Sequence, residues 1–570
     1  MRSDRKVMRL ATAGIIAAAI ISAYSGSISA GFHWDDGHTI TRNPAVRSTK
    51  AAFDTFINPR GFSAYGALMI RPLTVITYAI NYHLTGFDTK SWHVLNLLAH
   101  LVAALAMMWI AATLLGRIGF DEEQSLWGGL AAGLFFALNP IQEEAVNYFS
   151  ARSELLASSF CLLGLYFHLR DGDKRTKAEI LASICFVAGM ASRESAAVFP
   201  AMAVLCDLIT AQTDITSRLK KAAKTWPYWL LVLMYFIYRR ILLGIFTERD
   251  FVRGPADQIS VGMWAIGLYH KLILFPWNLS VSHPDPTSPA ITALFWVGIL
   301  LVVVELIFSI VLIKSRPLFP VAVGIFYMGL LPTLAIPLNY PAAEHRVYMA
   351  MAGPALIFGW LIAGLRAARP RLIAGLLLAV TVFLAATTRM DSRRWLNDFN
   401  LWSAAIKTHP ADYLAWTQYG KVMKESRRLN RAIFAYNRSI AIEPNSGAYI
   451  NLSIACGLVV DKNCAGDAIY KALQIDRDNP LAHFNLGLDY FEESRLEEAE
   501  SEFREAIRIM PVFPEAHKNF AVLLLSKNPP VEKEALEHLE LSIEQDPYQE
   551  EADIIKKKIV ELRGRLKGER

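Results

Sequence analysis

The chain has 570 residues, of which 53% are hydrophobic and only 19% are charged, and its formal net charge is +6 at pH 7. This composition excludes a purely soluble set of domains, which would carry more charge. The lysines and arginines gather in short loops between apolar runs, a pattern typical of membrane orientation that argues against nucleic-acid binding. The five cysteines include no CxxC pair, so we infer no metal or redox site from cysteine.

The first predicted element is an apolar run over residues 7–30, which follows a basic N-terminus. A secretory signal peptide has the same charge pattern and would be cleaved after Ala30. We favour an uncleaved anchor with Met1 in the cytoplasm, because the run reaches the length of about twenty residues that spans a bilayer and further spans follow.

Further apolar runs predict about eleven spans in a membrane domain of residues 1–388, with the basic loops on the cytoplasmic side. The run from Val261 to Phe275 would reverse every later loop if it were a full span, so we interpret it as re-entrant or interfacial. An odd number of spans then places the C-terminal domain opposite Met1. The predicted spans are 7–30, 92–115, 126–140, 153–169, 178–192, 195–210, 226–247, 290–313, 318–337, 350–365 and 372–388.

The stretch GFHWDDGHTITRN begins at Gly31 and opens a large first outer loop, residues 31–90. It places Asp35 and Asp36 directly after the first span. Carboxylates so close to hydrocarbon are costly to desolvate, so the pair predicts a functional site. The alternative is an N-cap role, in which Asp36 opens a short surface helix.

Charged residues of the later outer corners lie at the same end of their spans as the aspartates. A structural protein could use a few of them as interhelix ion pairs but has no need to place all of them at one end. Arginine binds phosphate oxygens through its planar fork, and acids supply general-base and cation-stabilising chemistry. The pattern predicts a site for an anionic, membrane-embedded substrate. Its residues are Arg71, Glu143, Glu144, Arg152, Arg193, Glu194, Arg239, Arg240, Glu344, His345 and Arg346.

The order of several motifs resembles that of the GT-C superfamily of integral-membrane glycosyltransferases. More narrowly, it resembles the branch with a C-terminal tetratricopeptide domain, which includes the transmembrane-and-tetratricopeptide protein O-mannosyltransferases. The motifs are WDD at 34–36, RPL at 71–73, HxxNxxxH at 93–100, NPxxxEAVxxxxxRxELLA at 139–157, RES at 193–195 and EHRVY at 344–348.

The resemblance implies an inverting transfer of a sugar, with mannose as the candidate, from a polyprenyl-phosphate donor to a protein hydroxyl on the outer face. It implies that Asp36, or its neighbour Asp35, is the catalytic base and that Glu144 is the second acid. Histidines are frequent in relatives at Asn139 and Gln142, so the roles of those histidines are not carried over. We predict no metal and no cofactor beyond the lipid-linked donor. The residues implied in substrate binding are Arg71, Arg152, Arg193, Glu194, Arg240, His345 and Arg346.

Several of these residues have a structural alternative. His93, Asn96 and His100 fall on one face of a span, where interhelix hydrogen bonding is a simpler expectation than metal binding. Arg239 and Arg240 could extend to lipid headgroups, although we expect at least one to bind phosphate. The pairs Arg152 with Glu154 and Arg193 with Glu194 fit either substrate binding or the capping of spans.

Beyond a linker at 389–408, residues 409–570 are polar and self-similar. Alanines at 415, 448, 482 and 516, and a second set at 432, 465, 499 and 535, recur at the tetratricopeptide period. The sequence therefore predicts an all-α chain, with a polytopic GT-C membrane domain followed by an α-solenoid of about four repeats and a capping helix. Such a solenoid has a concave groove for extended peptide, which would present a protein acceptor; the alternative is a brace for the membrane half.

Cys456 and Cys464 flank the hairpin turn of the second repeat, where they would be either two buried thiols or, outside the cytoplasm, a disulfide. We expect a bacterial inner-membrane protein with periplasmic repeats, or an endoplasmic-reticulum protein with luminal repeats if the chain is eukaryotic. Two other functions fit the sequence. One is a GT-C enzyme that glycosylates lipid or envelope polysaccharide, and the other is a non-catalytic membrane-anchored assembly factor.

Overall fold

The computed structural model describes residues 2–64, 68–170, 175–210, 215–244, 254–284, 292–337, 340 and 342–568. The regular secondary structure of these ranges is helical throughout, which confirms the predicted all-α class. The chain forms two compact units. The first comprises Met1–His33, Thr55–Asn58 and Ile70–Asn400, and the second comprises Trp34–Asp54, Pro59–Met69 and Leu401–Arg570.

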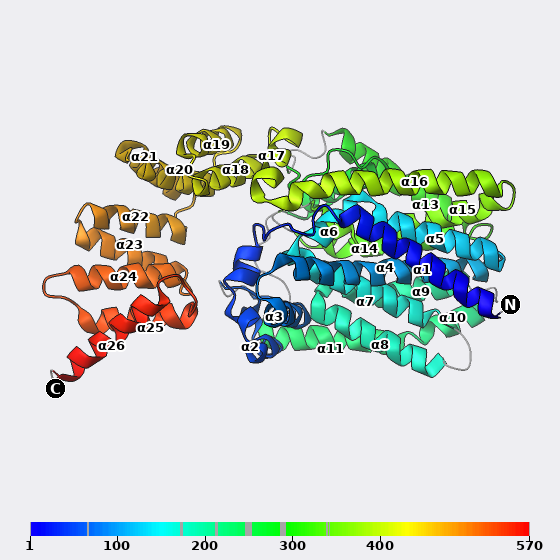
Figure 1. Cartoon of the computed structure of the whole chain (residues 1–570), viewed down its shortest axis with the longest axis horizontal. Coiled ribbons are helices and arrows are strands. Elements are labelled where there is room, and N and C mark those ends of the chain that lie inside the picture. Colours follow the sequence, from blue (N-terminus) through cyan, green and yellow to red (C-terminus); the bar gives the residue numbers. More distant parts are fainter. Residues whose placement is uncertain are drawn as a thin grey trace. The chain divides into compact units, whose positions relative to one another are not determined.

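The first unit is a bundle in which α1, α4, α5 and α16 lie side by side (Figure 1). Short 3-10 segments connect its long helices at η4 (Pro140–Gln142), η5 (Phe149–Ala151), η6 (Glu194–Val198), η8 (Glu344–Val347) and η9 (Ser392–Leu396). Its helices are α1 (Arg2–Tyr24), α3 (Pro72–Thr85), α4 (Thr89–Arg117), α5 (Glu122–Leu138), α6 (Glu143–Asn147), α7 (Arg152–His168), α8 (Arg175–Ser192), α9 (Phe199–Thr210), α10 (Ile215–Ala223), α11 (Trp226–Leu243), α12 (Pro255–Leu274), α13 (Ala293–Leu312), α14 (Leu318–Ala335), α15 (Ala352–Arg366) and α16 (Pro370–Asp391).

Each predicted span corresponds to one helix of this unit. Within the described ranges, four helical segments are long and apolar enough to cross a membrane by length and composition: Thr89–Arg117, Ala293–Leu312, Leu318–Ala335 and Pro370–Leu396. Parts of two predicted spans, at 245–247 and 290–291, lie outside the described residues. The membrane character of the chain is therefore supported, and the larger number of spans stays a prediction.

Glycines bring the central helices of the bundle into close contact. A Cβ added to Gly359 of α15 would lie 2.5 Å from the backbone oxygen of Gly128 in α5, and one added to Gly129 would lie 2.6 Å from that of Met108 in α4. Small residues at these crossings let the backbones approach, and packing of this kind holds helices together where lipid offers no hydrophobic driving force. Glycine is required at these positions because a side chain would clash with the backbone of the neighbouring helix.

The ambiguous run from Val261 to Phe275 lies in one continuous helix of 20 residues, α12, except for Phe275, which is the C-cap. Near its start, Gln258 Nε2 donates to the backbone oxygen of Leu334 at 2.9 Å, and near its end Ile273 O accepts from Asn139 Nδ2 at 3.2 Å. Both partners lie at helix ends that the predicted topology places on the outer face. The contacts thus favour the interfacial interpretation over a re-entrant loop.

The second unit contains the helical repeats, whose hairpins stack in sequence (Figure 1). Four hairpins and a final helix confirm the predicted tetratricopeptide solenoid. Small residues set the helix spacing: a Cβ on Gly487 would lie 2.9 Å from the Phe503 ring. After α17 (Asp398–Thr408), the hairpins are α18 (Tyr413–Glu425) with α19 (Leu429–Ile442), α20 (Ser446–Leu458) with α21 (Lys462–Ile475), α22 (Pro480–Glu492) with α23 (Leu496–Ile509), and α24 (Pro514–Ser526) with α25 (Glu532–Gln545), followed by α26 (Ala552–Gly568).

The compact units and the predicted domains divide the first outer loop differently. Much of the first outer loop, assigned above to the membrane domain, belongs to the same compact unit as the repeats. The Arg47 guanidinium lies 4.4 Å from the centre of the Tyr548 ring, and Trp34 packs edge-on against Trp402 at 5.5 Å. Cation–π and aromatic contacts of this kind join segments far apart in sequence, which no local pattern reveals. This loop contains η1 (Gly37–Thr41), η2 (Pro44–Arg47), α2 (Thr49–Asp54) and η3 (Pro59–Phe62).

Cys456 and Cys464 form a disulfide, with Cα atoms 5.8 Å apart. Of the two alternatives, the pair of buried thiols is thus contradicted. Cys456 ends the first helix of the second hairpin and Cys464 begins the next helix, so the turn between them places the two side chains at neighbouring ends of an antiparallel pair.

Candidate active site

A partly buried cluster of arginines and glutamates lies where α3, α7, η6 and α11 meet in the first unit. Glu194, at the start of η6, accepts from Arg71 Nη2 at 3.1 Å and lies 3.9 Å from Arg239 Nη1. Burial raises the pKa of Glu194, but Arg71, Arg193 and Arg239 lower it by more, and the net shift is far below its ordinary value. Glu194 is therefore charged and holds two arginines at one corner of the site.

The neighbouring residue, Arg193, is paired with Glu154 of α7. Arg193 Nε lies 3.1 Å from Glu154 Oε2, and the hydroxyls of Ser158 and Ser195 donate to the same carboxylate at 3.2 Å. Burial, and then repulsion from Arg71, lowers the pKa of Arg193 to about 10. The serines fix the carboxylate, so the orientation of Arg193 is set before any ligand arrives.

Glu144 and His345 form a second pair at the edge of this cluster. Glu144 Oε1 lies 2.8 Å from His345 Nδ1, and Oε2 accepts the backbone N–H of His345 at 2.9 Å. Burial raises the pKa of Glu144, but His345 lowers it by more, so the net shift is downward. An ionised Glu144 thus holds both the imidazole and the backbone of the EHRVY motif.

Arg346 follows His345 and has an unused donor. Its Nη1 donates to the backbone oxygen of Tyr340, whereas its buried Nε donates no hydrogen bond to any residue that the structure describes. Its electrostatic neighbours include Glu144, Glu154 and Arg71. Arginines therefore outnumber glutamates by one in this cluster, which we call the arginine cluster: Arg71, Arg193, Arg239 and Arg346, with Glu144, Glu154 and Glu194.

Arg152 is buried and makes its hydrogen bonds within the helical bundle. It is 0% exposed, and its guanidinium donates to Asn96 Oδ1 at 2.7 Å, Asn81 Oδ1 at 2.8 Å and the backbone oxygen of Trp92 at 3.1 Å. Its carbon Cζ also lies 5.0 Å from the centre of the Trp92 ring. These contacts favour the structural alternative, because the guanidinium donors are used within the protein, and the substrate-binding role of Arg152 stays a prediction.

The histidines of the HxxNxxxH motif make hydrogen bonds between segments. His93 Nε2 lies 3.2 Å from the backbone oxygen of Ala30, and His100 Nδ1 lies 2.7 Å from the hydroxyl of Tyr348. Asn96 Nδ2 donates to Val146 O at 2.8 Å. These contacts are those expected from the interhelix alternative.

Of the two adjacent arginines near the end of α11, Arg239 belongs to the arginine cluster, whereas the predicted Arg240 does not belong to it. Arg240 Nη1 instead donates to the backbone oxygen of Gly244, the residue that caps its own helix. Neighbouring positions on a helix point about 100° apart, so only one of the two can face the cluster. The substrate-binding role of Arg240 stays a prediction, and the geometry adds Arg239 as a candidate.

A second buried network was not predicted as a unit. Arg394 is paired with Glu143 and lies 3.4 Å from Glu344 Oε2, while Glu344 Oε1 lies 3.0 Å from His283 Nε2 and accepts the backbone N–H of Ser280 at 2.7 Å. Burial raises the pKa of Glu344 to about 8 although Arg394 lowers it, and it raises that of Glu143 as well. The basic linker at 389–394 and the outer glutamates were the only sequence signals for this network.

Asp35 and Asp36 belong to the second unit, in the loop that groups with the repeats. Asp36 is buried and occupies the N-cap position of η1, but its carboxylate makes no capping hydrogen bond there. Asp35 Oδ1 lies 3.4 Å from His38 Nε2. Trp34, directly before the pair, has a φ of 41°, a left-handed backbone that costs a bulky residue about 1–3 kcal/mol and that concentrates at functional sites. The geometry therefore weakens the simple N-cap interpretation.

His33, just before this strained residue, is the last residue of the first unit. Its Nδ1 lies 2.6 Å from Asp398 Oδ1 and its Nε2 lies 2.6 Å from the backbone oxygen of Trp395. The polypeptide that enters the Asp35–Asp36 segment is thus fixed by a buried histidine that contacts the linker through both ring nitrogens.

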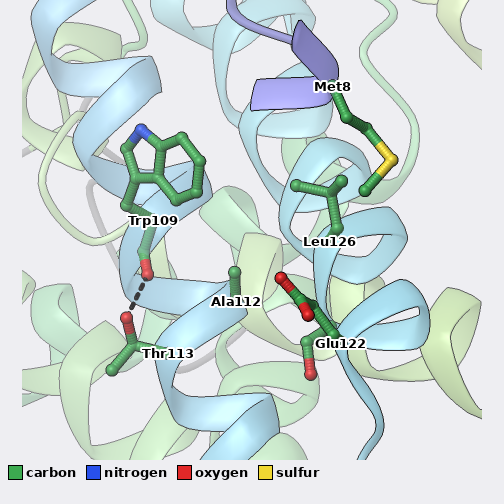
Figure 2. A pocket seen from close by; sticks show the side chains of 7 residues that line it. Met8, Trp109, Ala112, Thr113, Glu122 and Leu126 are labelled. Atoms are coloured by element: carbon green, nitrogen blue, oxygen red, sulfur yellow. Dashed lines mark hydrogen bonds between the residues drawn. The ribbon is translucent and has the colours of Figure 1, made fainter. Parts of the chain in front are cut away.

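One cavity of the first unit lies away from these residues. Figure 2 shows one of about 190 Å³ between α1, α4 and α5, where Met8 and Leu126 face Trp109 and Glu122. Glu122 begins α5, whereas Glu143 and Glu144 follow its end, so this cavity is at the other end of that helix. None of its lining residues is a predicted site residue. Among the described residues, no three His, Cys, Asp or Glu side chains are grouped as metal ligands.

Comparison with known proteins relates the chain to one group of transferases. It is 24% identical over 449 residues to the Caenorhabditis elegans protein O-mannosyl-transferase F38B6.6, covering 75% of this chain and 62% of the relative. It is 23% identical to the protein O-mannosyl-transferase TMTC3 of both Mus musculus and Homo sapiens, over 92% of this chain. The chain is homologous to the TMTC protein O-mannosyl-transferases.

The chain spans about 62 to 64% of the length of these TMTC relatives. No protein-family model matches it. Among solved structures, the protein named MamA matches 28% of this chain at 20% identity and a TM-score of 0.23. The Thermus thermophilus tetratricopeptide protein TTC0263 matches 31% at 22% identity and a TM-score of 0.26.

Proposed function

We propose that the chain is an inverting glycosyltransferase that transfers a sugar, mannose by analogy with the names of its relatives, from a polyprenyl-phosphate donor to a protein hydroxyl. The arginine cluster carries this proposal. Its arginines exceed its glutamates by one, and a lipid-phosphate sugar is a phosphodiester with one negative charge. Arg346 Nε, a buried donor with no hydrogen bond among the described residues, suits a phosphate oxygen.

In the proposed reaction, the acceptor hydroxyl oxygen attacks the anomeric carbon of the sugar. The bond from that carbon to the phosphate oxygen breaks, and its electron pair leaves with the lipid phosphate. The hydroxyl proton goes to the carboxylate of Asp36, or of Asp35 in its place. The arginines stabilise the charge that develops on the phosphate, and an oxocarbenium-like sugar passes between the two oxygens with inversion. A phosphate leaves readily, so no separate acid is required.

Glu144 has a positioning role in this proposal. Because it accepts from His345 Nδ1 and from the backbone N–H of His345, it fixes the start of the segment that contains Arg346. Arg71, Arg193 and Arg239 are fixed in the same way by Glu154 and Glu194. Preorganised charges of this kind lower the cost of reorganisation in the transition state. No metal or cofactor has a step in this scheme.

We place the reaction on the non-cytoplasmic face, in the periplasm of a bacterium or the lumen of the endoplasmic reticulum. The one-sided distribution of charged residues over the predicted spans supports this, as does the disulfide of the repeats, because disulfides persist in oxidising compartments. The tetratricopeptide groove would then meet secreted or membrane proteins as acceptors.

The test is transfer of radiolabelled mannose from polyprenyl-phosphate mannose to a Ser/Thr-rich acceptor protein by the purified full chain. Asp36→Asn should lower transfer at least a hundredfold, because an amide cannot take the hydroxyl proton. Asp54→Asn makes the same change at an exposed residue of the same loop and should leave transfer unchanged. If Asp36→Asn and Asp35→Asn both retain near wild-type turnover, the mechanism is wrong.

A further inference from the structure

A cavity of about 540 Å³ lies between three helices of the first unit, α8, α10 and α11. It is larger than the cavity of about 190 Å³ in Figure 2. Its walls come from the starts of α8 and α11 and from the end of α10. Most of its lining side chains are exposed, so the cavity opens at the surface. The polar and aromatic ones are Thr176, Glu179, Lys220, Lys224 and Trp226.

This cavity and the arginine cluster are at opposite ends of the same helices. α8 runs from the cavity to Ser192, the residue before Arg193, and α11 begins at Trp226 and contains Arg239 near its other end. The 18 residues of α8 make a helix about 27 Å long, close to the thickness of the hydrocarbon core. The cavity is therefore distinct from the arginine cluster and lies at the end that the predicted topology places in the cytoplasm.

Two lysines supply the positive charge of the cavity. Lys220 and Lys224 are four residues apart, and the N–H of Lys224 donates to the backbone oxygen of Lys221 at 3.0 Å, so a helical turn brings both lysines to the same side. Neither forms an ion pair with any residue that the structure describes. Because Glu179 is the one carboxylate among the described lining residues, the lysines exceed the acids by one, which matches the single negative charge of a phosphodiester.

A buried ion pair fixes the helix that carries these lysines. Lys221 Nζ lies 3.2 Å from Asp207 Oδ1, and Asp207 Oδ2 lies 3.0 Å from His168 Nε2. Asp207 belongs to α9 and His168 ends α7, so the contacts hold α10 against two helices of the bundle. Neighbouring positions on a helix point about 100° apart. Lys221 therefore binds the protein while Lys220 remains directed to the cavity.

Exposed aromatic and apolar side chains border the cavity along α11. Trp226 lines the cavity and is 64% exposed, and Trp229, three residues later, is 47% exposed. Tryptophan concentrates at the boundary between membrane and water, because its ring is apolar and its N–H is polar. Leu230 and Leu233 continue the exposed apolar surface along the same helix. An acyl chain can lie along this surface while its headgroup occupies the cavity.

We propose that this cavity binds the headgroup of an anionic phospholipid from the cytoplasmic leaflet. Lys220 and Lys224 contact the phosphate oxygens, and the partial positive charge at the starts of α8 and α11 favours the same anion. A phosphatidylcholine headgroup has no net charge and brings a cation towards the lysines, so it binds more weakly. The bound lipid fastens α10 to the membrane surface. The proposal does not depend on the transferase function, because lipid binding is measured without any transfer reaction.

The test titrates the full chain in detergent with dioleoylphosphatidylglycerol, and native mass spectrometry measures the Kd of the first lipid bound. Dioleoylphosphatidylcholine, which has the same acyl chains and no net charge, is titrated in parallel. Lys220→Gln with Lys224→Gln removes the two charges of the cavity, whereas Lys220→Arg with Lys224→Arg keeps them. The matched control, Lys314→Gln with Arg371→Gln, removes two exposed charges that do not line the cavity, from loops on the same predicted side.

We expect the glutamine variant to bind phosphatidylglycerol about thirtyfold more weakly, at about fivefold for each lysine. The arginine variant and the control should bind it like the wild type. Equal affinity of the wild type and the glutamine variant for phosphatidylglycerol, or equal affinity of the wild type for the two lipids, overturns the proposal. Glycerol 3-phosphate has the phosphate ester without acyl chains: if it binds as tightly as phosphatidylglycerol, the ligand is a soluble phosphate ester and the lipid assignment is wrong.

Discussion

The assignment of Arg152 separates a structural arginine from the arginines of the cluster, and it can be tested by stability. Arg152→Met keeps the length of the side chain but removes three hydrogen bonds, of 2.7, 2.8 and 3.1 Å, to acceptors in the bundle interior. Each buried acceptor left without a partner costs about 1–3 kcal/mol. Because such costs add incompletely, we expect a total loss of about 3–5 kcal/mol in the free energy of unfolding.

Arg152→Lys refines this expectation. Lysine keeps the charge, but one ammonium group cannot reproduce the fork that reaches three diverging oxygens, so we expect about 2–3 kcal/mol of destabilisation. Arg240→Lys, at an exposed position on α11, is the matched control and should change stability by less than about 0.5 kcal/mol.

The assay is unfolding in mixed micelles followed by tryptophan fluorescence, with donor KM measured on the folded fraction of each variant. We expect Arg152→Lys to unfold more easily and, where folded, to keep the donor KM of the wild type. A variant as stable as the wild type with a donor KM raised tenfold or more would refute the structural assignment and restore Arg152 to the substrate site.

Two further predictions concern the disulfide and Glu344. When protein is alkylated in intact cells and analysed by mass spectrometry without reductant, Cys456 and Cys464 should be found linked. The link closes a nine-residue loop and should contribute about 2–3 kcal/mol to the stability of the repeats. Alkylation of both thiols would contradict the disulfide and its support for an external location. The pKa of Glu344 is raised to about 8 in the folded chain from an ordinary value of 4.5, so its stabilising contribution is complete at low pH and is lost as the pH rises towards 8. The unfolding free energy of the wild type should therefore fall between pH 5 and 8, and this fall should be smaller in Glu344→Gln, which stays neutral, by at most about 1.4 kcal/mol per pH unit. Equal slopes of unfolding free energy against pH in both proteins would show that Glu344 is ionised when folded.

Patterns with a short period were readable from the sequence. The spacing of small residues in the repeats specified four hairpins and a capping helix, and each apolar run in the first part of the chain became one helix. These features depend on local propensity and on the periodic burial of one helix face, which are properties of neighbouring residues. The order of the motifs likewise indicated the transferase relatives.

The partners of charged residues depended on the tertiary structure. Arg152 and Arg193 each have a glutamate nearby in sequence, yet Arg152 is enclosed by asparagines and a backbone oxygen while Arg193 joins the arginine cluster. Arg239 faces that cluster and Arg240 does not, because helix rotation relative to its neighbours decides which side chain points inward. The link between Glu143, Arg394 and Glu344 joins residues far apart in the chain.

The sequence by itself determined which segments are helical, how many repeats follow, and which residue types are available for phosphate and proton chemistry. Only the tertiary structure decided that the Asp35–Asp36 loop packs with the repeats and that Cys456 and Cys464 are joined. The physical reason is the distance along the chain over which each kind of interaction acts. Helix formation and apolar periodicity act over a few residues, whereas ion pairs, ring contacts and stacked helices depend on the distances that the folded chain creates between remote segments.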